Sequence, residues 1–309
     1  MKRRQFLILG SLAGLGVAAV GKTVHAGLSA TPITETTNTT ENLRPNEDVL
    51  NDRLLLRFVA IADSGTGADG QYAVAKAMSQ YLQSNPFPLV LMAGDNIYNN
   101  GEIKKIKHVF EQPYAPLLQQ GVKFYAVLGN HDIRTENGNP QVEYSGFNMK
   151  GRYYTFRRGG VQFFALDTND NADWDAELPW LEAELRRSTA PWKVVFAHNQ
   201  IYSSGRYGVN QPFIQRLTPL FRRYGVQLYV NGHDHHYERT IPIHGTTYLT
   251  CGASAGVRDS GRSRWTVHSA SRLSFAAFDV YPNRMVIKGI GTDGTVFDRG
   301  MIPRYLVKR

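Results

Sequence analysis

Five apolar segments of this chain each end in residues that can bind a metal ion. The ligand-type residues at these ends are Asp63, Asp95 with Tyr98, Asn130 with His131, His198, and His233 with His235. Continuous apolar runs of this kind are typical of strands that are buried on both faces, as in parallel sheets. Because parallel strands present their carboxyl ends at one edge of a sheet, the pattern predicts one shared site at that edge.

Helical segments alternate with these strands, which indicates an α/β fold with two sheets packed face to face and helices outside. Helices are predicted over Tyr72–Leu82, Ile103–Phe110, Tyr114–Gln119, Trp180–Arg187 and Pro212–Tyr224. Strands are predicted over Leu54–Ala62, Leu89–Ala93, Lys123–Leu128, Tyr153–Phe156, Val161–Asp167, Trp192–Ala197, Val226–Val230, Thr247–Thr250, Ser274–Tyr281 and Met285–Gly289.

The first 30 residues have the composition of an export signal. Lys2, Arg3 and Arg4 precede an apolar run from Phe6 to Gly21. The run is shorter than the roughly 20 residues that span a bilayer, so a leader peptide is favoured over a membrane anchor. The start Arg3-Arg4-Gln5-Phe6-Leu7 resembles a twin-arginine signal, but the general secretory route stays open. We expect a periplasmic or secreted protein with no membrane attachment after leader cleavage.

Residues 31–50 are rich in Thr, Asn and Glu, which predicts a flexible linker, and a single domain is expected over residues 51–309. The leader carries four basic residues and no acidic one, so without it the formal charge falls from +9 to +5. This excess favours anionic substrates. The basic residues form no stripe, so no specific nucleic-acid partner is expected. The single cysteine, Cys251, excludes an intramolecular disulfide and is expected to be a buried small residue.

One motif points to a different function. The segment Gly65-Thr66-Gly67-Ala68-Asp69-Gly70 fits the dinucleotide-binding pattern G-x-G-x-x-G between a strand and a helix. However, Asp63 stands at the strand end, where its carboxylate would repel a pyrophosphate. The next strand end, at Asp95, fits metal binding at least as well as a ribose contact, so the dinucleotide interpretation is disfavoured.

Carboxylate and amide oxygens mixed with imidazoles suit zinc, iron or manganese. Even without His131, the seven other candidate ligands are too many for one catalytic metal that must keep open positions. They suit two metal ions that share a bridging carboxylate.

The order of these motifs resembles the calcineurin-like metallophosphoesterase superfamily. The motifs are Asp63-x-Gly65, Gly94-Asp95-x-x-Tyr98, Gly129-Asn130-His131-Asp132, Ala197-His198 and Gly232-His233-x-His235-x-Tyr237-Glu238-Arg239. Tyr98 and the Tyr237-Glu238-Arg239 ending make the chain most similar to purple acid phosphatases. The resemblance implies a four-layer sandwich of two mixed sheets flanked by helices, and a hydrolase that uses a metal-bound hydroxide.

The resemblance also implies a division of the ligands. Asp63, Asp95, Tyr98 and His235 would bind the first metal, ferric iron. Asp95, Asn130, His198 and His233 would bind the second, which is zinc, iron or manganese. Asp95 would bridge the two. His131 is expected to contact the transferred phosphoryl group together with Asn130, and Asp132 or another acceptor is expected to orient His131.

The chain departs from the family at one position. Purple acid phosphatases carry another histidine nine or ten residues after the position of His198, where this chain has Arg206-Tyr207-Gly208. Arg206 and Tyr207 are therefore candidate substrate contacts.

Three functions remain open from the sequence. The first is an exported phosphomonoesterase acting on a small phosphoester, and the second is a phosphodiesterase acting on nucleotides or lipids. The third is a metal-dependent phosphate binder without turnover, which the complete ligand set disfavours. The sequence does not indicate an oligomeric state.

Overall fold

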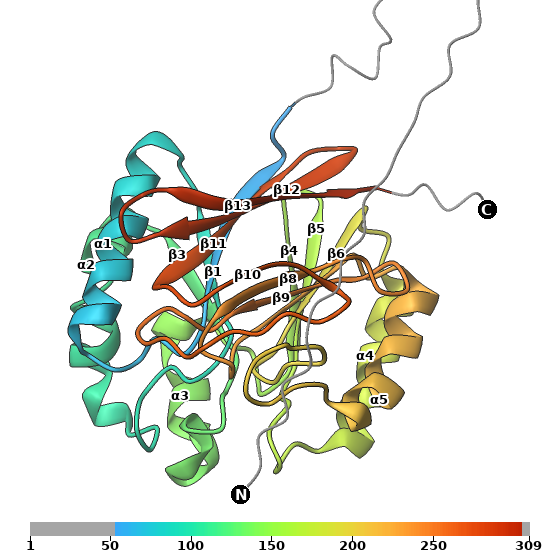
Figure 1. Cartoon of the computed structure of the whole chain (residues 1–309). Coiled ribbons are helices and arrows are strands. Elements are labelled where there is room, and N and C mark those ends of the chain that lie inside the picture. The colour runs from blue at the N-terminus through green and yellow to red at the C-terminus, as the bar shows by residue number, and fades with distance from the viewer. Residues whose placement is uncertain (1–52, 305–309) are drawn as a thin grey trace, which may run out of the picture. The chain divides into compact units, whose positions relative to one another are not determined.

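Two β-sheets form the centre of the part of the chain that the structure describes, residues 53–304 of a computed structural model. The predicted leader (residues 1–30) and linker (residues 31–50) lie outside the described residues. The sheets are arranged as predicted, and helices cover them on both outer sides (Figure 1).

The first sheet has six strands in the order β13-β12-β11-β1-β2-β3. Strands β1, β2 and β3 are parallel, whereas β11, β12 and β13 join antiparallel. The sheet is therefore mixed. Its strands are β1 (Leu56–Ile61), β2 (Leu89–Met92), β3 (Lys123–Ala126), β11 (Ser274–Val280), β12 (Arg284–Gly291) and β13 (Val296–Pro303).

The second sheet has seven strands in the order β10-β8-β9-β7-β6-β5-β4. Strands β5, β6, β7 and β9 are parallel, and antiparallel strands flank this block. Its strands are β4 (Tyr154–Arg158), β5 (Val161–Ala165), β6 (Trp192–Phe196), β7 (Leu228–Asn231), β8 (Tyr237–Thr240), β9 (Thr247–Cys251) and β10 (Thr266–Ala270).

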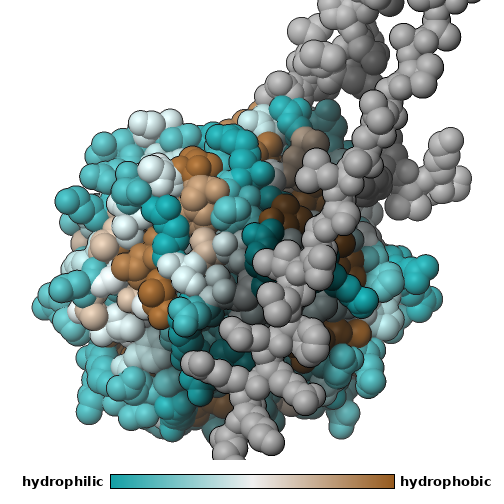
Figure 2. All heavy atoms as spheres, in the orientation of Figure 1, coloured by the Kyte–Doolittle hydropathy of each residue, from teal (hydrophilic) through white to brown (hydrophobic). Residues whose placement is uncertain are grey.

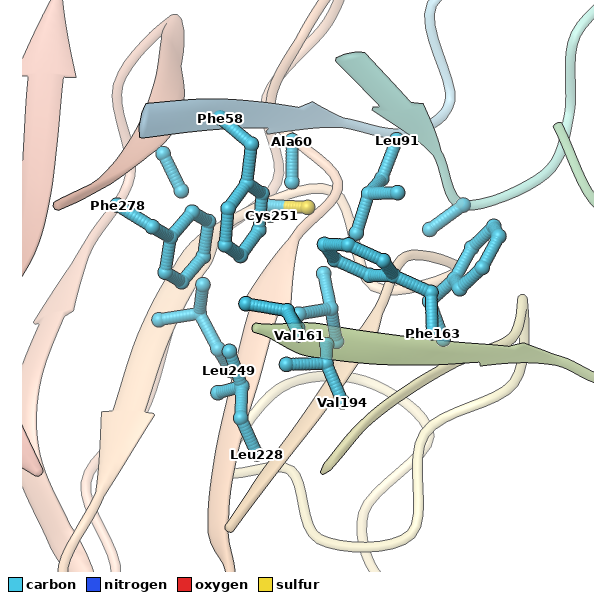
Figure 3. Packing of buried hydrophobic residues seen from close by; sticks show 14 of the residues in the cluster. Phe58, Ala60, Leu91, Val161, Phe163, Val194, Leu228, Leu249, Cys251 and Phe278 are labelled. Atoms are coloured by element: carbon cyan, nitrogen blue, oxygen red, sulfur yellow. The ribbon is translucent and has the colours of Figure 1, made fainter. Parts of the chain in front are cut away.

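The core between the sheets is built from alternate residues of the strands. On β1, Phe58 and Ala60 face the other sheet, while Val59 and Ile61 face the helices. Phe58 packs edge-on against Phe163 of β5, with ring centroids 5.2 Å apart, and so joins the two sheets (Figure 3). Alternate residues of each strand face opposite sides of the sheet, and both sides are apolar. The strands therefore appear in the sequence as continuous apolar runs.

Cys251 lies in the same core and is buried, as expected (Figure 3). Burial raises the pKa of its thiol well above the usual range. A protonated, inaccessible thiol is a packing residue and not a nucleophile.

Helices cover the outer faces. Val74 and Met78 of α1 (Asp69–Ser84) and Leu117 of α2 (Ala115–Gln119) pack with the outer face of the first sheet. Leu181 of α4 (Trp174–Arg187) and Leu217 of α5 (Gln211–Tyr224) pack with the outer face of the second. This gives the four layers that were predicted.

The structure also corrects the prediction in several places. Strands β8, β10 and β13 and the short helix α3 (Asn139–Glu143) were not predicted. The segment predicted as one helix over Ile103–Phe110 is a 3₁₀ turn followed by a π-helical turn over Lys107–Glu111. Helix α4 begins at Trp174 and not at Trp180, because Asp173 caps it by accepting a hydrogen bond from the Ala176 amide at 3.2 Å.

The surface is mostly hydrophilic on the face seen in Figure 2, where hydrophobic residues form small separate patches. Within residues 53–304, no helix has the length and apolar character needed to cross a membrane.

One buried carboxylate connects the two sheets. Asp298 of β13 accepts a hydrogen bond from the Tyr237 hydroxyl at 2.7 Å and two from the Arg239 guanidinium at 2.7 and 2.8 Å. Tyr237 and Arg239 belong to β8 in the other sheet. The Tyr-Glu-Arg ending of the metal motif thus has a structural role: two of its three side chains hold the sheets together.

We predict that Asp298→Asn lowers the free energy of unfolding by about 3 kcal/mol, because it leaves the Arg239 charge without its partner in a buried position. Burial opposes the charge of Asp298, but the hydrogen bonds from Arg239 and Tyr237 outweigh it and hold the pKa of Asp298 below the usual range. The contribution is therefore present above about pH 4 and is lost as the pH falls through the lower pKa of the folded state.

Denaturant unfolding of the wild type and the variant measures this difference at neutral pH and at pH values below 4. The exposed neighbour Arg299 serves as control, since Arg299→Gln should change stability by less than about 0.5 kcal/mol. Equal effects of the two substitutions would contradict the role of Asp298.

Candidate metal centre

The seven predicted ligands lie together at the carboxyl ends of the central strands. Asp63 follows β1, Asp95 and Tyr98 follow β2, and Asn130 follows β3. The three histidines come from the second sheet: His198 follows β6, and His233 and His235 follow β7. The site therefore spans both sheets, and the packing between the sheets sets the distances between its ligands.

Four side chains form a first compact group around the Tyr98 hydroxyl. Its oxygen lies 2.8 Å from Asp95 Oδ2, 3.2 Å from Asp63 Oδ1 and 3.2 Å from His235 Nε2. His235 Nε2 is in turn 3.3 Å from Asp63 Oδ1. These are the four residues that the resemblance assigns to the first metal.

A second group surrounds His198. Its Nε2 lies 3.1 Å from Asn130 Oδ1, 3.2 Å from His233 Nδ1 and 3.5 Å from Asp95 Oδ1. These are the four residues assigned to the second metal. Asp95 belongs to both groups and presents a different oxygen to each. Single ligand atoms of Asp63, Asp95 and His198 all lie within 4.8 Å of one another, close enough to surround metal ions.

Hydrogen bonds to the backbone fix the orientation of the ligands. His198 Nδ1 is 3.0 Å from the Ala93 carbonyl oxygen, which can only accept, so Nδ1 carries the hydrogen and Nε2 is free to bind a metal. Asp63 Oδ2 accepts from the His233 amide, and Asp95 Oδ1 accepts from the His131 amide, both at 2.9 Å. Each carboxylate is thereby tied to a loop that carries another ligand.

The local backbone is unusual at the ligands. Asp63, Asp95 and His233 have positive φ angles of 55°, 53° and 70°, a region that residues other than glycine rarely adopt. Such conformations cluster at functional sites, where the surrounding structure enforces them.

Two motif glycines are required for close approach. A Cβ at Gly129 would lie 2.2 Å from Asp95 Oδ1, and one at Gly232 would lie 2.3 Å from Asp63 Oδ2. The glycine before Asn130 and the glycine before His233 therefore each make room for a ligand from another strand end.

The charges of the cluster fit a metal centre. Burial and the charges of Asp63 and Asp95 raise the pKa of the Tyr98 phenol far above its usual range. Burial opposes protonation of His198, but Asp95 and Asp63 outweigh it and raise its pKa. Within residues 53–304, neither carboxylate is hydrogen-bonded to a Lys or Arg side chain. Oxygen and imidazole donors that gather around uncompensated negative charge are the donors that a di- or trivalent cation requires.

His233 behaves differently from His198. Burial and the neighbouring His198 imidazole lower the pKa of His233 to about 3. A neutral imidazole is the form that binds a metal, and Nδ1 is the nitrogen that faces the second group.

His131 lies beside the cluster, as predicted, but Asp132 does not orient it. His131 Nδ1 donates to the Asn99 carbonyl oxygen at 2.7 Å, and Nε2 is 3.3 Å from an Arg134 nitrogen, which can only donate. Arg134 also donates to the Asn99 carbonyl at 3.2 Å. Asp132, the acceptor that the prediction named, therefore does not hold this imidazole; another acceptor, the Asn99 carbonyl, holds it together with Arg134.

Asp132 connects the two loops that carry Asp95 and Asn130. Its fully buried carboxylate accepts hydrogen bonds from the backbone amides of Asn96, Ile97 and Gly129 at 2.8–3.0 Å. Burial and the charge of Asp95 raise the pKa of Asp132 to about 7, against the effect of those hydrogen bonds. Asp132 thus joins the loop after β2 to the loop after β3. Because its carboxylate is fully buried, it cannot contact a substrate.

Tyr207 lies at the mouth of the second group. Its ring stacks on the His233 imidazole, with centroids 3.9 Å apart and planes inclined by 20°, and its side chain is exposed. Arg206 is also exposed, and its guanidinium carbon is 5.8 Å from the Tyr207 ring. The structure thus places Tyr207 against a candidate metal ligand, with Arg206 beside it.

Two acidic residues of the histidine motif, Asp234 and Glu238, hold the loop that carries Tyr207. Asp234 accepts a hydrogen bond from Ser203 Oγ at 2.5 Å, and Glu238 accepts from the Ser204 amide at 2.6 Å. His233 and His235 face the metal groups, whereas Asp234 and Glu238 face the other way and anchor this loop.

Sequence reasoning missed Arg134 and Arg258. Arg258 donates to the His233 carbonyl oxygen at 3.3 Å, and its guanidinium carbon is 5.7 Å from the Tyr207 ring. Arg258 follows Gly252-Ala253-Ser254-Ala255-Gly256, a loop of small residues after the parallel strand β9. Because β9 is a further parallel strand, its carboxyl end could have indicated that the loop with Arg258 reaches the site.

Comparison with known proteins agrees with this geometry. Residues 56–237 match the family model of the calcineurin-like phosphoesterases. Purple acid phosphatase 7 of Arabidopsis thaliana is 32% identical over 236 residues, which cover 65% of this chain and 70% of that protein. Tartrate-resistant acid phosphatase type 5 of the mouse, Mus musculus, is 26% identical over 297 residues, 81% of this chain and 90% of that protein.

The fold has a solved counterpart. The purple acid phosphatase PPD1 from seeds of yellow lupin, Lupinus luteus, superposes with a TM-score of 0.71 at 21% identity, over 81% of this chain and 54% of that chain. This likeness shows the shared fold, and the family itself implies a dinuclear metal centre. The chain therefore belongs to the calcineurin-like phosphoesterase family, as a phosphoric ester hydrolase of the purple acid phosphatase-like type.

Proposed function

We propose that the chain is an exported phosphomonoesterase that acts on a small phosphoester with two metal ions. The observation that carries this proposal is the pair of four-atom groups that share the carboxylate of Asp95, which contributes one oxygen to each group. Asp63, Asp95, Tyr98 and His235 would hold iron. Asp95, Asn130, His198 and His233 would hold zinc, iron or manganese.

Two bound metal ions would lower the pKa of a coordinated water, orient the phosphate oxygens and stabilise an in-line displacement. The side chains at the rim would then position the substrate. The position of His131 supports this role, because the Asn99 carbonyl and Arg134 hold its ring next to Asp95, with Nε2 3.9 Å from Asp95 Oδ2. Arg206 and Tyr207 would contact the substrate at the second group, where relatives use a histidine.

We predict that His131→Ala lowers turnover of nitrophenyl phosphate by roughly 10²–10⁴-fold while the protein keeps its metal ions, because His131 touches the substrate and binds no metal. Turnover and metal content are measured on the same preparation. The matched control is His244→Asn, which changes an exposed turn histidine with positive φ and should leave turnover unchanged. Loss of metal from the His131 variant would instead mean that His131 supports Asn130.

The same assay separates the two hydrolase functions. Faster release of nitrophenol from the monoester than from bis(nitrophenyl) phosphate supports a phosphomonoesterase. The opposite order would favour a phosphodiesterase, and tight phosphate binding without release from either ester would overturn both.

The iron assignment predicts a colour. A phenolate bound to ferric iron absorbs visible light, so the protein should be violet or pink, and Tyr98→Phe should remove the colour. Tyr207→Phe is the control, because the Tyr207 ring stacks on His233 outside the first group and loss of its hydroxyl should leave the absorption band in place. A colourless wild type with full metal content and activity would rule out an iron–Tyr98 bond.

Export rests on the amino-terminal sequence. If the twin-arginine route is used, Arg3→Lys together with Arg4→Lys should keep the protein inside the cell, because the receptor reads the arginine pair and not the charge alone. Cell fractionation measures this. Normal export of the double variant would favour the general secretory route, and full-length protein in the membrane would favour an anchor.

A further inference from the structure

A cavity of about 500 Å³ opens beside the first group of ligands. Asp63, Tyr98 and His235 form one wall, and Thr66, Lys105 and His108 form much of the rest. A volume of this size is sufficient for a small organic group. The inference drawn below rests on the proposed function, because it concerns the part of the substrate that is not transferred.

Three side chains that line this cavity away from the ligands, those of Thr66, Lys105 and His108, can donate hydrogen bonds, whereas Val109 beside them is apolar. Lys105 Nζ donates to the Tyr98 carbonyl oxygen at 3.2 Å and to Glu102 at 2.9 Å, which leaves one of its three hydrogens free. Glu102 does not line the cavity, so a group inside it meets the ammonium first. Thr66 Oγ1 accepts from the Ala68 amide at 3.1 Å, so its own hydrogen is free to donate.

His108 is exposed, and within residues 53–304 neither of its ring nitrogens has a hydrogen-bond partner. Its place is defined by packing. A Cβ at Gly67, which has a φ of 69°, would lie 2.4 Å from His108 Nε2, so the imidazole lies directly over the Gly67 backbone. The π-helical turn Lys107–Glu111 presents His108 to the cavity, and such turns occur frequently at functional sites.

This contact also explains the glycine motif that resembled a dinucleotide-binding loop. A Cβ at Gly65 would collide with the Asn96 carbonyl oxygen at 1.8 Å, and Gly67 makes room for His108. The glycines thus let the loop after β1 approach the loop after β2 and this cavity.

The cavity on the other side of the site has a different character. It has a volume of about 410 Å³ and lies beside Asn130 and His233 of the second group. Its wall contains both Arg134 and Asp170, whose opposite charges offset each other, together with the amides of Asn169 and Asn199. Of these two cavities beside the candidate ligands, the one next to Tyr98 joins a permanent cation, Lys105, to further donors, and its lining contains no carboxylate other than that of Asp63, a candidate metal ligand.

We propose that the Lys105–His108 cavity is a subsite for an oxyanion on the leaving portion of the substrate, either a carboxylate or a second phosphate. Lys105 supplies the charge, and His108 and Thr66 supply hydrogen bonds. The preferred substrates are then phosphomonoesters that carry a second anionic group, and Lys105 and His108 set this specificity.

The test compares substrates that differ by one anionic group. Phenyl phosphate is compared with 4-carboxyphenyl phosphate and with 4-(phosphonomethyl)phenyl phosphate, whose carbon–phosphorus bond is not hydrolysed. At low ionic strength, the double variant Lys105→Gln/His108→Gln should lower kcat/KM for the anionic esters about tenfold more than for phenyl phosphate, since hydrogen bonds to charged groups are lost. A preference for only one of the two anionic esters identifies the group that the cavity takes.

Two further variants constrain the result. Lys104→Gln removes the adjacent exposed lysine, which does not line the cavity, and should change the selectivity less than about twofold. Glu102→Gln removes the partner of Lys105 and should raise the preference for anionic esters. Selectivity that is the same in the wild type and the double variant would overturn the proposal.

A binding measurement separates this proposal from the proposed function. Calorimetry compares benzylphosphonate with 4-carboxybenzylphosphonate, which are not hydrolysed. Tighter binding of the carboxylated ligand that is lost in the double variant supports the subsite even if none of the three esters is a substrate. Failure of the wild type to hydrolyse any of these esters would contradict the phosphomonoesterase proposal alone, whereas equal affinity for the two phosphonates would contradict the subsite.

Discussion

The carboxylate of Asp95 is the contact on which the site depends. One oxygen faces Tyr98 at 2.8 Å, and the other lies 3.5 Å from His198. Asp95 can serve both groups because it stands at the end of β2, between the ends of β1 and β3. Asp132 fixes the loop that carries Asp95, because its carboxylate accepts hydrogen bonds from the Asn96 amide after β2 and from the Gly129 amide after β3. The positive φ of Asp95 and the glycine at 129 are consequences of bringing this carboxylate so close to its neighbours.

Because the ligands come from two sheets, sheet packing is part of the site. Asp63, Asp95, Tyr98 and Asn130 belong to the first sheet, and the three histidines belong to the second. The apolar core around Phe58 and Phe163 and the buried contacts of Asp298 hold these two halves at a fixed spacing. A metal centre needs its ligands placed within a few tenths of an ångström, so a well-packed core between the sheets is a requirement of the chemistry.

The sequence was sufficient for the central strands and for the ligands at their ends, because buried parallel strands form continuous apolar runs and ligand-type residues interrupt them sharply. It was insufficient for β8, β10 and β13. On β8, Glu238 is buried and Arg239 is mostly buried, and both are satisfied by partners far along the chain, such as Asp298. No local pattern reveals such pairs. The same reason explains why the sequence did not show which acceptor holds His131. A backbone carbonyl, that of Asn99, holds the ring, and backbone acceptors leave no signal in the residue types.

The most direct test of a shared carboxylate is the metal content of Asp95→Asn. The wild type should bind about two metal ions per chain, and Asp95→Asn should bind well below two and lose turnover, because both groups lose a charged ligand. Asp170→Asn, which changes an exposed carboxylate in the neighbouring cavity, should retain both ions. Two ions retained by Asp95→Asn, each at full occupancy, would contradict the bridging role of Asp95 and with it the account of the site given above.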